Sequence, residues 1–182
     1  MKKIILTLLV LAIAITSAFS AFIEIGPTAT IENVDLRHDD LSDLNYTEFS
    51  NYRYGMDARI NILHVAAHVS SFYVPATDKN PALFDTSLYG IVNFELFDGI
   101  SFGFGPGLNY DVNPDKLPKD YKEVILDGHF EAKTHLSVAI DDTVLTAYYV
   151  LPTNYQFAGG RPSNGVLAWD RGYIGFSVLL GF

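Results

Sequence analysis

The chain has 182 residues, enough for one domain, and its lack of cysteine excludes disulfides and thiolate metal sites. Asp and Glu number 21 against 12 Lys and Arg, which gives a formal net charge of −9. Such an acidic chain lacks the basic face that nucleic acid binding rewards, so nucleic acid is not an expected partner.

The first twenty residues predict a secretory signal peptide. Lys2 and Lys3 form a positive start, residues 4–14 are apolar except for Thr7, and residues 18–20 read Ala-Phe-Ser, a small-x-small cleavage site. A membrane anchor is the alternative, but the apolar run is shorter than the ~20 residues of a spanning helix. We therefore expect a signal peptide over residues 1–20 and one domain over residues 21–182.

The mature sequence contains runs in which apolar and polar residues alternate. Alternation with period two predicts β-strands, because a helix would spread these apolar residues around its whole surface. Each run has about ten residues, the length that a tilted strand needs to cross a bilayer. We find eight such runs, at residues 23–32, 52–62, 64–73, 88–96, 100–110, 129–140, 143–151 and 173–182.

The connections between these runs alternate in length. Short turns are expected near Leu63, at residues 97–99 and at residues 141–142, whereas residues 33–48, 75–86, 112–127 and 152–168 form long connections. This pattern is typical of an outer-membrane barrel that has both termini in the periplasm and its long loops outside the cell.

Turn chemistry tests the register, because residues paired across a hairpin point to the same side of the sheet. Leu96 and Ile100 should flank a three-residue turn in which Gly99 takes a positive φ. Ile140 should pair with Thr143. The seventh run, which is apolar on both faces, then turns Thr146 and Tyr148 inward and the following residues toward lipid: Leu145, Ala147, Tyr149 and Leu151.

The last ten residues resemble the C-terminal signature of bacterial outer-membrane proteins. Phe182 ends the chain, and Phe176, Val178 and Leu180 precede it at every second position. The plan is similar to the small barrels of the OmpX, OmpW and OmpA-barrel type. The resemblance implies an all-β, eight-stranded antiparallel up-and-down transmembrane β-barrel in the cell outer membrane. It also implies outer-membrane lipid and the barrel-assembly machinery as partners.

Inward-facing charges are expected to fill the lumen of this barrel. Eight strands leave an interior just wide enough for side chains, and opposite charges buried there should pair. We therefore favour a plugged lumen with a structural or surface-interaction role over a narrow pore for small or apolar solutes. Inward Gly103, Gly105 and Gly107 either leave a small cavity or allow strong curvature. The expected ion-pair network comprises Arg53, Asp57, Arg59, Glu95, Glu131 and Lys133.

Three further readings of the sequence remain open. A lipid-modifying enzyme would use the first long loop, where His38, Asp39, Asp40, Ser42 and Asp43 cluster. The acidic loops could bind divalent cations or an extracellular ligand. A soluble calycin-like barrel would instead turn Phe102 and Phe104 inward and Arg53 and Arg59 outward.

We expect no catalytic residue, no cofactor and no metal site. His64 and His68 share one strand face, but four residues at ~3.3 Å per residue separate them by roughly 13 Å, too far for one ion. A site made by His64 or His68 with His129 or His135 would require closure of the barrel to bring two strands together.

Overall fold

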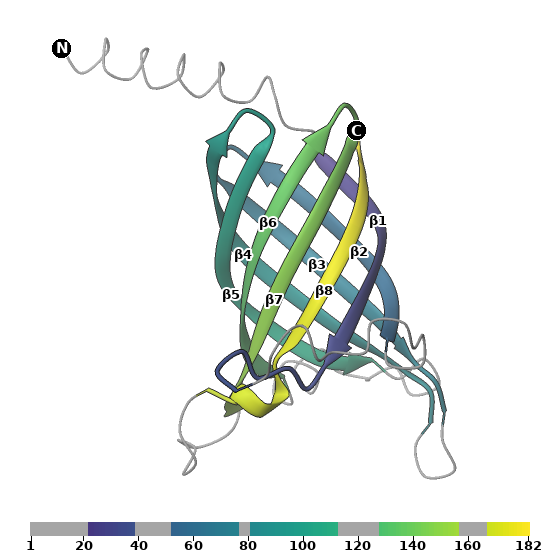
Figure 1. Cartoon of the computed structure of the whole chain (residues 1–182). Helices are drawn as coiled ribbons and strands as arrows, with labels where there is room; N and C mark the ends of the chain where they lie inside the picture. The colour runs from purple at the N-terminus through teal and green to yellow at the C-terminus, as the bar shows by residue number, and fades with distance from the viewer. Residues whose placement is uncertain (1–21, 39–51, 77–80, 113–127, 157–166) are drawn as a thin grey trace, which may run out of the picture.

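Eight antiparallel strands close into one barrel in sequence order (Figure 1). The computed structural model describes residues 22–38, 52–76, 81–112, 128–156 and 167–182. The all-β, eight-stranded, up-and-down fold expected from the alternation is confirmed. Its strands are β1 (Ile23–Glu32), β2 (Tyr52–Ile62), β3 (Val65–Val74), β4 (Leu83–Phe97), β5 (Ile100–Val112), β6 (His129–Ile140), β7 (Thr143–Gln156) and β8 (Tyr173–Gly181).

Closure comes from pairing of the first strand with the last, which leaves no free sheet edge. A path along paired residues from Ile23 around the barrel returns to β1 about ten residues further along the chain. This stagger tilts the strands by roughly 40° from the barrel axis. Residues far apart in sequence therefore meet at the same height in the lumen.

The barrel is apolar outside and polar inside. Exposed side chains include Met56, Leu88, Phe104 and Phe176, whereas buried ones include Asp57, Arg59 and Lys133. The soluble calycin-like reading required the opposite arrangement, so the structure contradicts it. In β7 the inward direction predicted for Thr146 and Tyr148 is confirmed, because both are buried inside the barrel. Leu151, which we expected to face lipid, is buried, at 9% exposure.

The short turns lie together at one end of the barrel, where Phe182 also ends the chain (Figure 1). The predicted pairing of Ile140 with Thr143 is confirmed, as is the positive φ of Gly99, at 73°. The prediction for Leu96 and Ile100 was wrong. Phe97 pairs with Ile100 around a two-residue turn, and a β-bulge between Glu95 and Phe97 takes up the extra residue.

Three strands extend into segments expected to be loops, β5 by the single residue Val112. β4 begins at Leu83, and β7 continues through Pro152 to Gln156. Proline cannot donate a ladder hydrogen bond, but the register between β6 and β7 shifts between His129 and Glu131, beside Pro152, and such irregularities accommodate proline in sheets. A 3-10 turn, η3 (Trp169–Arg171), then leads into β8.

Several predicted features lie outside the described residues. These are the signal peptide at residues 1–20 and, in the first long connection, Asp39, Asp40, Ser42 and Asp43. In the part of the chain that the structure does describe, no helix has the length and apolar character needed to span a membrane.

Candidate functional site

Arg53 organises the lumen at the end of the barrel that carries the long connections. Its guanidinium lies between the carboxylates of Glu32 and Asp85 and bonds both. The Asn109 amide also donates to Asp85, and the Phe72 ring lies 5.2 Å from the Arg53 guanidinium carbon. Arg53 is thus held by two acids, Glu32 and Asp85, that the sequence analysis did not assign to the network.

Tyrosines fill the next layer of the lumen. The hydroxyl of Tyr89 donates to Glu131 and lies 3.0 Å from the hydroxyl of Tyr173. No Lys or Arg of the described chain forms an ion pair with Glu131, although we expected one. Lys133 follows two residues later on β6, about 7 Å along the strand, and its amine points to other partners. Phenol hydroxyls therefore solvate this buried carboxylate.

The middle of the lumen holds a buried lysine and aspartate. Lys133 Nζ lies 3.8 Å from Asp57 Oδ2, donates to Ser70 Oγ at 3.0 Å, and lies 4.2 Å from the Tyr148 ring centre. Ser177 Oγ donates to Asp57, and it lies 3.0 Å from Thr28 Oγ1. Both charged side chains are 1% exposed, so this layer is closed to solvent.

Arg59 forms the last polar layer before the short turns. Its Nη1 lies 3.6 Å from Glu24 Oε2 and donates to Ser137 Oγ at 3.3 Å, while Asn61 donates to the other Glu24 oxygen at 2.8 Å. Glu95, also predicted to belong to the network, is exposed near the mouth of the lumen. It forms no ion pair with the described residues, and Arg59 pairs with Glu24.

Inward glycines make room for side chains of the neighbouring strands. A Cβ atom on Gly107 would lie 2.2 Å from the Tyr89 ring, and one on Gly103 would lie 2.3 Å from Asn93 Oδ1 and 2.4 Å from His135 Cε1. At these two positions the predicted cavity is therefore absent, because neighbouring side chains occupy the space that glycine leaves.

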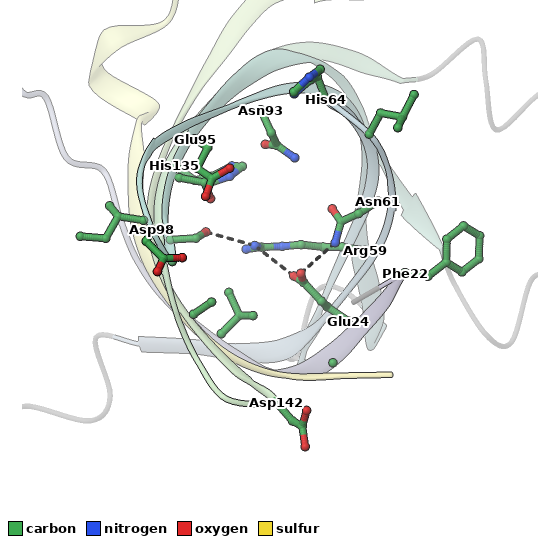
Figure 2. A pocket seen from close by; sticks show the side chains of 18 of the residues that line it. Phe22, Glu24, Arg59, Asn61, His64, Asn93, Glu95, Asp98, His135 and Asp142 are labelled. Carbon is green, nitrogen blue, oxygen red and sulfur yellow. Dashed lines mark hydrogen bonds and ion pairs between the residues drawn. The ribbon is translucent and has the colours of Figure 1, made fainter. Parts of the chain in front are cut away.

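A cavity does open at the short-turn end of the lumen. Its volume is about 760 Å³, and Arg59, Glu24, Asn93 and His135 lie among its lining residues (Figure 2). Figure 2 shows Arg59 extending across the lumen, with the Glu24 carboxylate beside its guanidinium. The lumen is thus sealed in its middle and hollow at this end.

Barrel closure brings His68 and His135 together, although they lie on strands that are not neighbours in the sheet. The His68 and His135 ring centres are 5.2 Å apart. Neither ring nitrogen of His68 has a hydrogen-bond partner among the described residues. The described residues contain no group of three or more His, Cys, Asp or Glu side chains placed to hold a metal ion.

The start of the first long connection folds back on the barrel rim. Asp35 accepts two hydrogen bonds from the Arg37 guanidinium, at 3.0 and 2.7 Å, and lies 3.1 Å from His38 Nδ1. The Arg37 bonds hold the pKa of the Asp35 carboxyl well below its usual range. His38 therefore already contacts a carboxylate within this segment, whereas Ser42 lies outside the described residues.

Sequence reasoning missed the tyrosine contribution to the lumen. The expected lumen network did not include Tyr89 and Tyr173, yet both contact Glu131 inside the barrel. Their phase could have placed them inside, because Tyr89 alternates with exposed Leu88 and Tyr173 alternates with Ile174. No protein-family model matches the chain, and no curated protein matches its sequence.

Proposed function

We propose that this chain is a non-enzymatic outer-membrane β-barrel, exported by a signal peptide, whose closed lumen suits a structural or surface-interaction role. The observation that carries the proposal is the sidedness of the barrel. Buried ion pairs occupy its interior, and large apolar side chains remain exposed around its exterior. In water such an exterior would drive aggregation, whereas in a bilayer it contacts lipid.

The lumen supports a non-conducting barrel. Between the Arg53 and Arg59 layers, Tyr89 and Lys133 are each 1% exposed and Tyr148 is 3% exposed. Their hydrogen bonds and ion pairs reach across several strands. An ion crossing this region would have to displace buried charges from their partners, which is costly in a low-dielectric interior.

Conductance in planar lipid bilayers tests this closure. The refolded wild-type protein should show no steady discrete openings. The double variant Tyr89→Ala/Tyr148→Ala removes two rings from the seal and should conduct. Tyr73→Ala is the matched control, because the Tyr73 side chain lies on the exterior and is 52% exposed. Steady openings of the wild-type protein would overturn the closed-lumen proposal.

A narrow pore is the second candidate, favoured by the cavity at the short-turn end. Because of that cavity, an ion crossing the lumen would meet closely packed side chains only between the Arg59 and Arg53 layers. The pore reading expects wild-type openings whose amplitude changes in Lys133→Met, since Lys133 lies in the middle of the barrier. The same bilayer recordings therefore decide between the two candidates.

The C-terminal strand supports assembly into the outer membrane. Phe176, Val178, Leu180 and Phe182 all lie on the exposed face at the end of the eighth strand. Phe182→Ser should lower the amount of heat-modifiable, folded barrel in outer-membrane fractions. Phe97→Ser is the matched control, because Phe97 lies at the same end and is 72% exposed, against 73% for Phe182. Equal losses in both variants would refute a specific assembly signal.

Lipid modification from the first loop is tested by substitution of its candidate residues. On the non-enzymatic proposal, the double variant His38→Ala/Ser42→Ala leaves the lipids of the host membrane unchanged. Mass spectrometry of lipid extracts from cells that express either protein measures this. A lipid species that wild-type cells contain and the variant cells lack would overturn the proposal.

A further inference from the structure

The cavity at the short-turn end has the size of a ligand pocket. Its volume of about 760 Å³ falls within the range of small-molecule sites, roughly 300–1,000 Å³. One end is the polar Arg59 layer, which closes the lumen, and the residues of all three short turns surround the other. A ligand could therefore enter from this end without passing the sealed middle of the barrel.

The lining of this cavity is strongly acidic. It includes five carboxylates, Glu24, Glu95, Asp98, Asp141 and Asp142, and one cationic side chain, Arg59. Arg59 is engaged with Glu24, so the four acids nearer the mouth have no basic partner among the lining residues. A cleft lined by one sign of charge between low-dielectric walls concentrates counter-ions, here cations.

Two residues that line the cavity, His135 and Asn93, carry polar atoms without a hydrogen-bond partner among the described residues. His135 is 3% exposed, and its Nδ1 has no hydrogen-bond partner among the described residues. Asn93 Oδ1 is likewise buried and unpartnered. Figure 2 shows the Asn93 side chain directed into the lumen. A carboxamide oxygen and the free nitrogen of a neutral imidazole both accept N–H donors.

A single metal ion does not suit this arrangement. The acids come from different turns and strands, and no three His, Cys, Asp or Glu side chains of the described chain are placed to hold a metal. Apolar residues also line the cavity, including Leu63, Ile100, Ala139 and Val144. A lining that combines acids from different turns and strands with apolar side chains matches a ligand whose charges are separated by methylene groups.

We propose that this cavity binds a linear organic diamine or polyamine. One ammonium group lies near Glu95, Asn93 and His135, the methylene chain contacts the apolar wall, and a second ammonium group lies among the aspartates of the turns. The inference goes beyond the proposed function, because the cavity and its charges belong to the fold whether or not the lumen conducts. In the proposed orientation the cavity opens toward the periplasm.

Isothermal titration calorimetry of the refolded barrel in a zwitterionic detergent tests the proposal, with 1,5-diaminopentane as the probe. We expect saturable binding at one site per barrel that weakens as salt screens the carboxylates. Hexanoate should not bind, because the acids repel its carboxylate. Mg²⁺ should compete only weakly, because it lacks a set of three ligands.

Variants locate the binding site. Glu95→Gln/Asp98→Asn should weaken diamine binding by about three- to tenfold, as expected for the loss of two partly solvated ion pairs. Asn93→Leu replaces the amide by an apolar side chain of similar size and so removes the Oδ1 acceptor. It should weaken diamine binding about threefold or more. Asp170→Asn is the matched control, since it removes an exposed acid on η3, at the opposite end of the barrel.

Three results would overturn the proposal. The first is the absence of saturable diamine binding at millimolar concentration. The second is Mg²⁺ binding as tight as diamine binding and equally sensitive to the Glu95 and Asp98 substitutions. The third is weakening by Asp170→Asn equal to that by Glu95→Gln/Asp98→Asn, which would indicate non-specific attraction to an acidic protein.

Discussion

Gly175→Ala should destabilise the barrel because it places a methyl group where a tyrosine ring lies. A Cβ atom at this position would be 2.2 Å from Tyr148 Cζ and 2.4 Å from the Tyr148 hydroxyl oxygen. The ring cannot swing aside easily, because it is 3% exposed and its hydroxyl is hydrogen-bonded to Thr28 at 2.6 Å.

The expected cost follows from this overlap. Overpacking a filled core costs about 1–3 kcal/mol, and loss of the Tyr148–Thr28 hydrogen bond would place the value toward the upper end. Tyr148→Ala alone should cost about 3–5 kcal/mol, as for other large aromatic truncations. In that background Gly175→Ala should cost little, because the vacated space accepts the methyl group. The double-mutant cycle should therefore give a coupling of about 1–3 kcal/mol.

Urea unfolding of the barrel in lipid vesicles measures these free energies, and Trp169, the only tryptophan of the chain, reports the transition. Gly90→Ala is the matched control, since no atom lies within 4 Å of a Cβ built at this exposed strand position. If Gly175→Ala proved as harmless as Gly90→Ala, or if the cycle showed no coupling, the packing of Tyr148 over Gly175 would be refuted.

Lys133→Met should destabilise the barrel by about 3–5 kcal/mol in the same unfolding assay, because it leaves Asp57 buried without its ion-pair partner; full stability of the variant would contradict this. Ala147→Arg, on the outer face of β7 opposite Leu136 and Phe176, should cost about 2–4 kcal/mol in vesicles, and no loss would argue against lipid contact there. Asp35 should titrate well below the ordinary aspartate pKa of about 3.9, and Arg37→Gln should raise its pKa toward that value. Since the folded-state pKa is lowered, the Asp35–Arg37 contribution to stability is present above the unfolded pKa and is lost as the pH falls through the folded one. Carboxyl NMR titration measures both pKa values, and equal midpoints in the two proteins would refute the assigned cause.

Local pattern was sufficient to predict the strands and the direction of their side chains. A strand exposes alternate residues to opposite faces, so the phase of Phe176, Val178 and Leu180 determined which side of β8 is apolar. The placement of Thr146 and Tyr148 followed from a two-residue turn at residues 141–142 and the pairing beside it. These inferences use neighbours in sequence, and the structure confirms them.

The details of hairpins and strand ends were predicted less well. The bulge between Glu95 and Phe97 shortened a turn that the sequence predicted to be longer. Pro152 suggested a loop, yet β7 continues through it beside a register shift. In the first place an irregular pairing takes up one extra residue, and in the second it accommodates a proline. The alternation of apolar and polar residues carries no information about such irregularities.

The sequence by itself determined that eight alternating strands with an acidic, mostly polar inner face would form a barrel with an apolar exterior. The tertiary structure alone decided which inner residues meet. Closure and the stagger of about ten residues around the barrel bring Asp57 to Lys133 and His68 to His135, which lie on strands that do not pair with each other. The tertiary structure also places Glu131 within hydrogen-bond distance of the Tyr89 hydroxyl and leaves a cavity at the short-turn end. These contacts depend on closure and strand tilt, which are properties of the whole sheet and are not encoded in the alternation of any single strand.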